Sequence, residues 1–122
     1  LAYDELFAQQ MSLALARKYF RKTKGVSISG TGFLTKPLRE KLSFSLTAAQ
    51  ERAIKEISKD LKSELRMNRL LQGDVGSGKT IVSLISIMTV IEFGGQAALL
   101  APTEILATQH FNTINKFLEE SR

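Results

Sequence analysis

One stretch of the sequence has residue types and spacing that predict nucleotide chemistry. Residues 73–80 spell GDVGSGKT, which fits the pattern G-x-x-x-x-G-K-[ST] at every fixed position. Glycines let successive backbone N–H groups turn toward a phosphate, and a following helix directs its positive end at the same anion. The predicted loop that binds a nucleoside triphosphate consists of Gly73, Asp74, Val75, Gly76, Ser77, Gly78, Lys79 and Thr80.

Two residues at the end of this loop are the candidates for a role in catalysis. Lys79 has a mobile cationic side chain that can reach the β- and γ-phosphates. The Thr80 hydroxyl is a ligand suited to Mg²⁺ that bridges these phosphates. We therefore predict that the chain binds a nucleoside triphosphate together with Mg²⁺.

The structural alternative is a glycine-rich turn that only caps a helix. With Gly near 7% of average protein residues, chance matches to the pattern are expected in below about 1% of chains this short. The flanks also fit, because residues 66–72 form a short strand-like run and residues 81–91 have the composition of a buried helix. A plain turn does not require Gly-Lys-Thr at the helix start, so we favour the triphosphate site.

The elements that must position this loop follow from the surrounding pattern. Gly94 and Gly95 end the helix after the loop, and residues 96–101 form a second short apolar run typical of a strand. A helix follows and extends to about Glu120. This order predicts an α/β fold, a βαβα unit with parallel strands, whose site lies at the carboxyl ends of those strands.

The segment before the loop predicts a helix that begins at Thr47 and extends to Leu65. Thr47 and Gln50 have the spacing of a capping box, in which two side chains satisfy donors at a helix start. A glutamine amide also presents a donor and an acceptor together, which is the pair needed to contact the edge of an adenine. Both interpretations of Gln50 fit the spacing.

The N-terminal region is basic and helical. Residues 4–22 have helical spacing, and the formal net charge of +5 lies within residues 1–43, which hold eight Lys/Arg and three Asp/Glu. A local basic patch suggests an anionic surface such as nucleic acid, whereas cations at a helix end also complement the helix dipole without any ligand. The basic residues at this helix end are Arg17, Lys18, Arg21, Lys22 and Lys24.

Residues 25–33 break the helical periodicity with three glycines and several small hydroxyl residues. We expect an exposed, mobile linker there, followed by a short helix at 38–42. The predicted organisation is therefore a helix at 1–24, a linker at 25–43 and a nucleotide-binding region at 44–122.

The composition limits the class of protein. At 122 residues and 43% hydrophobic content the chain has the size of one domain, and it contains no apolar run long enough to cross a membrane. With no cysteine and one histidine, any metal must be held by oxygen ligands. We expect a cytoplasmic protein. Because the chain begins at Leu1 and ends directly after a helical pattern, we also expect it to be a piece of a longer protein.

Three blocks together resemble the superfamily 2 helicases. Residues 44–50 (FSLTAAQ) are similar to their Q motif, residues 73–80 to motif I, and residues 101–107 (APTEILA) to motif Ia, in the same order and spacing. The sequence of residues 70–80 (LLQGDVGSGKT) most resembles that of the bacterial ATP-dependent DNA helicases that remodel forks and Holliday junctions. Residues 1–10 are similar to the helix that joins a DNA-binding domain to the motor in those proteins.

The resemblance implies a partial RecA-like P-loop NTPase fold, ATP and Mg²⁺ as ligands, and branched DNA as partner. It implies that Gln50 contacts adenine, that Phe44 packs on the base, and that Pro102, Thr103 and Glu104 lie along a DNA strand. Fork reversal and branch migration in recombination and repair are the implied function. The alternatives are a translocase similar to transcription-repair coupling factors, or a P-loop module that uses nucleotide as a switch for partner binding.

Two expectations concern the chain by itself. The acidic motif II of such helicases is not found in these residues, so we expect the chain alone to contact ATP without hydrolysing it efficiently. Two short parallel strands without neighbours leave unpaired edges, so we expect the isolated chain to self-associate, although the full-length protein is expected to be a monomer.

Overall fold

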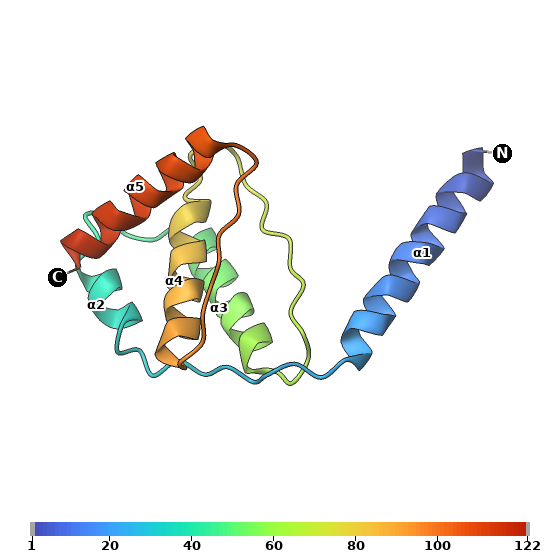
Figure 1. The fold of residues 1–122 in the computed structure, drawn as a ribbon, viewed down its shortest axis with the longest axis horizontal. Coiled ribbons are helices and arrows are strands. Elements are labelled where there is room, and N and C mark those ends of the chain that lie inside the picture. Colours follow the sequence, from blue (N-terminus) through green and yellow to red (C-terminus); the bar gives the residue numbers. More distant parts are fainter. Residues whose placement is uncertain (1, 122) are drawn as a thin grey trace.

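The computed structural model describes residues 2–121, and its ordered elements in that range are five helices (Figure 1). Each helix predicted from the sequence is present, and α2 begins earlier and α3 ends earlier than expected. The helices are α1 (Ala2–Lys22), α2 (Thr35–Glu40), α3 (Ala48–Lys62), α4 (Lys79–Glu92) and α5 (Glu104–Glu120).

A small core forms where α2, α3 and α4 meet. Four of its side chains come from α4, which is apolar on several sides because it lies between α3 on one side and α2 and α5 on the other. Helix α4, which follows the predicted phosphate-binding loop (residues 73–80, below called the phosphate loop), is thus the centre of the packed region. The buried residues are Leu38, Ile54, Ile57, Ile81, Val82, Leu84 and Ile85.

Helix α1 projects away from the other four helices (Figure 1). None of its described residues is buried, so its large apolar side chains are exposed to solvent. The chain returns to the packed region just after this helix, where Lys24 and Leu65 form an isolated antiparallel bridge and Gly25 N donates to Glu64 O at 2.7 Å.

The glycine-rich segment after α1 is a loop and most of its residues are exposed, as predicted, but hydrogen bonds hold it against the end of α3. Ile28 N donates to Leu61 O at 2.7 Å, and the Ser27 hydroxyl donates to Lys62 O at 2.6 Å, so this segment satisfies free carbonyls at the end of α3. Leu38 of α2 then enters the core. The region 25–43 is therefore partly built into the fold.

Glu92, the last residue of α4, holds the start of α2. Its Oε1 accepts hydrogen bonds from the backbone N–H groups of Leu34 (2.6 Å) and Thr35 (2.9 Å), and its Oε2 accepts from that of Gly32 (2.8 Å). A carboxylate at a helix N-terminus satisfies donors that have no partner within the helix. Burial by itself would raise the pKa of Glu92, but these backbone hydrogen bonds outweigh it and lower the pKa below its ordinary value.

The two predicted strands are not formed among residues 2–121. Residues 66–72 and 96–101 are extended, and the only bridge in the described chain is the one at Lys24 and Leu65. A strand exists only when a second strand supplies hydrogen bonds, and these two segments do not pair with each other. Accordingly, Leu70 and Leu100 remain 79% and 94% exposed. The predicted order survives only as extended segment, helix, extended segment and helix, and no parallel sheet is formed among residues 2–121.

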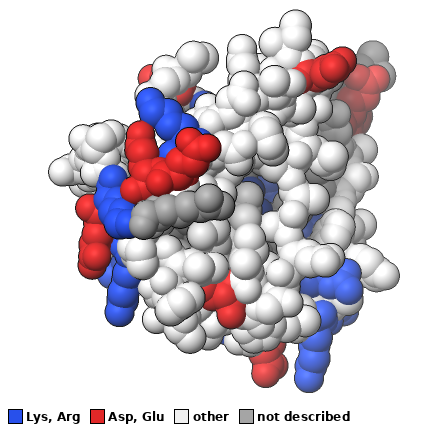
Figure 2. All heavy atoms as spheres, turned by 60° about the vertical axis from the view of Figure 1, so that its left-hand side comes forward, with Lys and Arg blue, Asp and Glu red and all other residues white. Residues whose placement is uncertain are grey.

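Charges of both signs lie around the edge of the face shown in Figure 2, and its centre is largely uncharged. This mixture agrees with the equal numbers of basic and acidic residues in the sequence after residue 43. The excess of positive charge therefore belongs to the N-terminal region.

Candidate nucleotide-binding site

The phosphate loop leads directly into α4, as the motif requires. Gly76 and Gly78 have φ angles of 81° and 79°, a left-handed conformation that glycine adopts readily and other residues adopt at a cost. Ser77 N donates to Asp74 O at 3.0 Å and closes a turn within the loop. Gly78 caps α4 without a side chain, so the first N–H groups of the helix stay free of side-chain partners.

At two of the glycines an added side chain would also meet a neighbouring side chain. A Cβ atom at Gly73 would lie 2.5 Å from the Ser77 hydroxyl oxygen. A Cβ atom at Gly78 would collide with the amide nitrogen of Gln50. The loop is therefore closely packed against itself on one side and against the start of α3 on the other.

Lys79 and Thr80 have different surroundings. The Lys79 ammonium donates to the carbonyl of Gly73 and, at 3.3 Å, to that of Asp74, so it lies folded over the loop. The hydroxyls farther along α4 donate to carbonyls one turn back within the helix. The Thr80 hydroxyl makes no hydrogen bond recorded for residues 2–121, which leaves it available to a ligand at the helix start.

Gln50 contacts both the start of α3 and the loop. Its Oε1 accepts from Thr47 N at 2.8 Å, and Thr47 Oγ1 accepts from Gln50 N at 3.2 Å, so the predicted capping box is confirmed. Its Nε2 donates to Ser77 O at 3.0 Å. A primary amide has two N–H donors and two acceptor lone pairs, so one of each remains unused here. Capping therefore does not exclude contact with an adenine edge.

A pocket of about 410 Å³ lies between the loop and the first turns of α3. Its wall combines apolar side chains of α3, α4 and the segment before the loop with polar groups of the loop. The residues from the predicted site that line it are Gln50, Gly73, Asp74, Ser77, Gly78 and Lys79.

Phe44 and the motif Ia residues lie outside this pocket. Phe44 packs edge-on against Phe117 of α5, with ring centroids 6.1 Å apart, and lines a separate pocket of about 590 Å³. Thr103 caps α5 by accepting from Leu106 N at 3.2 Å, and Pro102 and Glu104 are exposed beside it. The structure therefore brings the loop and Gln50 together and leaves these four residues apart from them.

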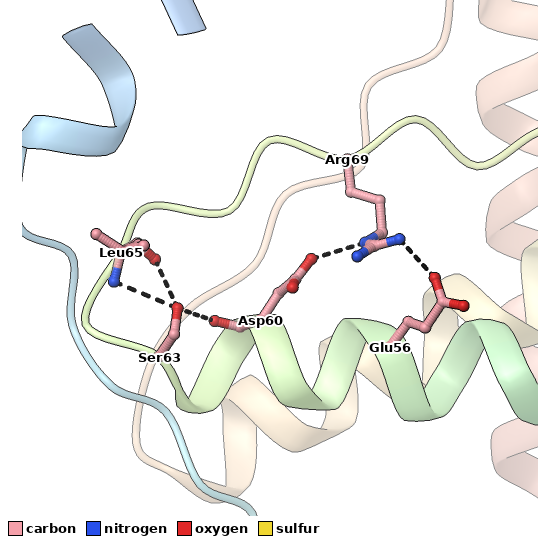
Figure 3. A network of polar contacts seen from close by, with 5 residues as sticks. All are labelled: Glu56, Asp60, Ser63, Leu65 and Arg69. Atoms are coloured by element: carbon pink, nitrogen blue, oxygen red, sulfur yellow. Dashed lines mark hydrogen bonds and ion pairs between the residues drawn. The ribbon is translucent and has the colours of Figure 1, made fainter. Parts of the chain in front are cut away.

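Arg69 is a residue of this region that was not singled out from the sequence (Figure 3). Its Nε donates to Asp60 Oδ2 and its Nη1 donates to Glu56 Oε2, both at 2.7 Å, so it joins the segment before the loop to α3. The hydrogen bond to Asp60 is the main cause that raises the pKa of the Arg69 guanidinium. The sequence signal was two acids one helical turn apart on α3, a pair that a single guanidinium can bridge.

Two classes of feature are absent from the part of the chain that the structure describes. Within residues 2–121 there is no group of three or more His, Cys, Asp or Glu side chains placed to hold a metal ion. Nor does any helix in that range have the length and apolarity needed to cross a membrane.

Comparison with known proteins gives consistent results. Residues 47–122 match the family described as DEAD/DEAH box helicase. The chain is 50% identical over 119 residues to the ATP-dependent DNA helicase RecG of Aquifex aeolicus, covering 97% of this chain and 15% of that protein. It is 47% identical over 118 residues to the RecG of Thermotoga maritima, covering 96% of this chain and 15% of that protein.

A solved structure is similar over most of the chain. The structure of RecG bound to a three-way DNA junction matches with a TM-score of 0.84 and 45% sequence identity, covering 93% of this chain and 16% of that one. The chain thus spans about 15% of the length of the curated relatives it matches.

Proposed function

The chain belongs to the DEAD/DEAH box helicase family, and on that basis we propose that it forms the nucleotide-binding start of an ATP-dependent DNA helicase motor. The observation that carries this proposal is the pocket between the phosphate loop and Gln50. One side offers a glycine loop, an ammonium group and a helix N-terminus for phosphates. The other side offers the unused donor and acceptor of a glutamine amide for a base.

We propose ATP as the nucleotide, with Gln50 contacting adenine and residues 73–80 surrounding the phosphates. Lys79 already donates to two loop carbonyls, so a bound β- or γ-phosphate would replace these carbonyls as its acceptor. An anion is the stronger acceptor for an ammonium group. Phe44 is proposed to pack on the base only after a change of position, because it lies in the neighbouring pocket.

Thr80 fits a site for Mg²⁺. Its hydroxyl has no recorded partner within residues 2–121, and it lies one residue after the lysine at the start of α4. A hydroxyl oxygen is a ligand that Mg²⁺ accepts alongside phosphate oxygens and water. When bound, Mg²⁺ would neutralise charge on the phosphates. The acids that would complete the metal site are not grouped in the described residues.

We propose branched DNA as the partner, since the matching solved structure is that of RecG on a three-way junction. Pro102, Thr103 and Glu104 are the proposed contacts to a strand, because they are exposed at the start of α5, where backbone N–H groups favour a phosphate. We also propose that residues 66–72 and 96–101 become parallel strands of a RecA-like sheet when further strands of the longer protein lie beside them.

The test is nucleotide hydrolysis by the full-length protein that contains these residues. We expect ATP hydrolysis that is stimulated more by forked than by linear duplex DNA, and a loss of at least about 100-fold in Lys79→Ala, since electrostatic stabilisation of the phosphates is lost. Lys55→Ala, an exposed lysine of α3, is the matched control and should hydrolyse ATP normally. Nucleotide binding without any DNA-stimulated hydrolysis would refute the helicase proposal and favour a nucleotide switch.

A further inference from the structure

Arg69 joins the segment that enters the phosphate loop to the helix that carries Gln50. Its guanidinium makes one hydrogen bond to each of two carboxylates on α3, both at 2.7 Å, as Figure 3 shows. Two acids four residues apart lie on one face of a helix, so both arms of the guanidinium engage a single rigid surface. The two hydrogen bonds therefore hold Arg69 against α3 and also set its position along the axis of that helix.

The segment runs back along α3 from this contact to the loop. From the midpoint of Glu56 and Asp60 to Gln50 is about 12 Å along a helix at 1.5 Å per residue. From Arg69 to Gly73 is about 13 Å of extended chain at 3.3 Å per residue. The lengths agree, so fixing Arg69 against these two acids brings the loop level with the first turn of α3, where Gln50 donates to Ser77 O.

The bridge between Lys24 and Leu65 fixes the chain just before this segment, and beyond it Arg69 makes the recorded polar contacts to α3. Residues 66–72 make no backbone–backbone hydrogen bond recorded within residues 2–121. Leu71 packs on the core while Leu70 points to solvent, as alternation along an extended segment requires. Arg69 and Leu71 therefore face α3 together. A slip of one residue would turn both away and move the loop by about 3.3 Å.

We infer that Arg69 is a positioning residue of the nucleotide site, which holds the phosphate loop in register with Gln50 through Glu56 and Asp60. The inference rests on the proposed function, since it concerns the same site. Without Arg69 the loop should still bind phosphates, because the groups that contact them belong to the loop itself and to the start of α4. What depends on Arg69 is the alignment of that loop with the base contact on α3.

The test compares three ligands on the full-length protein: ATP, GTP and inorganic tripolyphosphate. In Arg69→Met, we expect ATP to bind about three- to tenfold more weakly, with a smaller preference over GTP. Tripolyphosphate should bind as it does to the unaltered protein. Removing the partners in Glu56→Gln/Asp60→Asn should reproduce this pattern, and Arg69→Lys, which keeps one ion pair, should give an intermediate loss.

Controls separate positioning from a general loss of structure. Arg52→Met removes another exposed arginine, one with no recorded ion pair in residues 2–121, and should leave all three affinities within about twofold. In a Gln50→Ala background, Arg69→Met should have no further effect on ATP, because the contact it aligns is gone. Circular dichroism shows whether each variant folds. If Arg69→Met does not fold, Arg69→Lys is used in its place.

The outcomes are distinct. Equal losses of ATP and tripolyphosphate affinity, or additive losses with Gln50→Ala, would overturn the positioning role and leave the proposed function intact. Unchanged ATP affinity in Arg69→Met would do the same. An unaltered protein that binds none of the three ligands would overturn the proposed function and this inference with it.

Discussion

Glu92 should contribute a large share of the local stability of the segment that precedes α2. One carboxylate accepts three backbone hydrogen bonds, from Gly32, Leu34 and Thr35, at 2.6–2.9 Å. In Glu92→Gln, one oxygen becomes an NH₂ group, which cannot accept and meets at least one N–H group head-on. Hydrogen bonds to a charged acceptor contribute about 1.5–3 kcal/mol each, so we expect a loss of about 2 kcal/mol in the opening free energy of this segment.

Hydrogen–deuterium exchange of the amides in this segment measures its opening free energy directly. A loss of about 2 kcal/mol corresponds to amide exchange about 30-fold faster over residues 30–36. Glu119→Gln is the matched control, since Glu119 is exposed near the end of α5, and it should leave this exchange unchanged. Equal exchange in Glu92→Gln and the unaltered protein at pH 7 would refute the argument.

The pH dependence of this contribution has a definite sign. The pKa of Glu92 is lowered in the folded protein, from an ordinary value of 4.5, so its contribution is complete above about that pH. The contribution is lost as the pH falls through the lower, folded pKa. The difference in exchange between Glu92→Gln and the unaltered protein should therefore shrink on acidification below pH 4.5. A difference that grew on acidification would contradict the assigned cause.

Three further predictions concern the site and the extended segments. Thr47→Ala removes half of the capping box, so the free energy of unfolding measured in urea should fall by about 1 kcal/mol, whereas Thr113→Ala, within α5, should change it less. Gly78→Ala places a Cβ against Gln50 at a left-handed φ of 79°, so ATP affinity measured by calorimetry should fall by more than about tenfold. By size-exclusion chromatography the isolated 13.5 kDa chain should elute as a larger species, and Leu100→Lys should shift it toward monomer; monomeric elution of the unaltered chain would contradict the expected self-association.

The features predicted correctly from the sequence are those set by local chemistry. The phosphate loop needs left-handed residues at fixed positions, and the structure has Gly76 and Gly78 in that conformation. The capping box needs Thr47 and Gln50 at a fixed spacing, and both of its hydrogen bonds are present. The resemblance to helicases, which depended on these motifs, is confirmed by the family match over residues 47–122.

The features missed are those set by contacts between distant segments. Glu92 lies at least 57 residues away in the sequence from the N–H groups that donate hydrogen bonds to it. Nothing in the neighbouring sequence distinguishes it from an ordinary exposed helix residue. The same holds for the carbonyls at the end of α3 that bind residues 25–28. Glycine-rich composition predicted freedom of the backbone there, but composition carries no information about a partner supplied by another helix.

The absence of the two predicted strands among residues 2–121 has a related cause. The same cause indicates whether the site would keep its geometry if a strand paired with residues 66–72. Apolar composition predicts that a segment will be covered, whereas a strand also requires a neighbour with free backbone groups. Residues 66–72 meet α3 through Arg69 and Leu71, while Leu70 and the backbone groups remain free within the described chain. A neighbouring strand can therefore pair with this segment without displacing any contact that positions the phosphate loop. For that reason the arrangement of the loop, Gln50 and Arg69 should persist in the complete sheet that we propose.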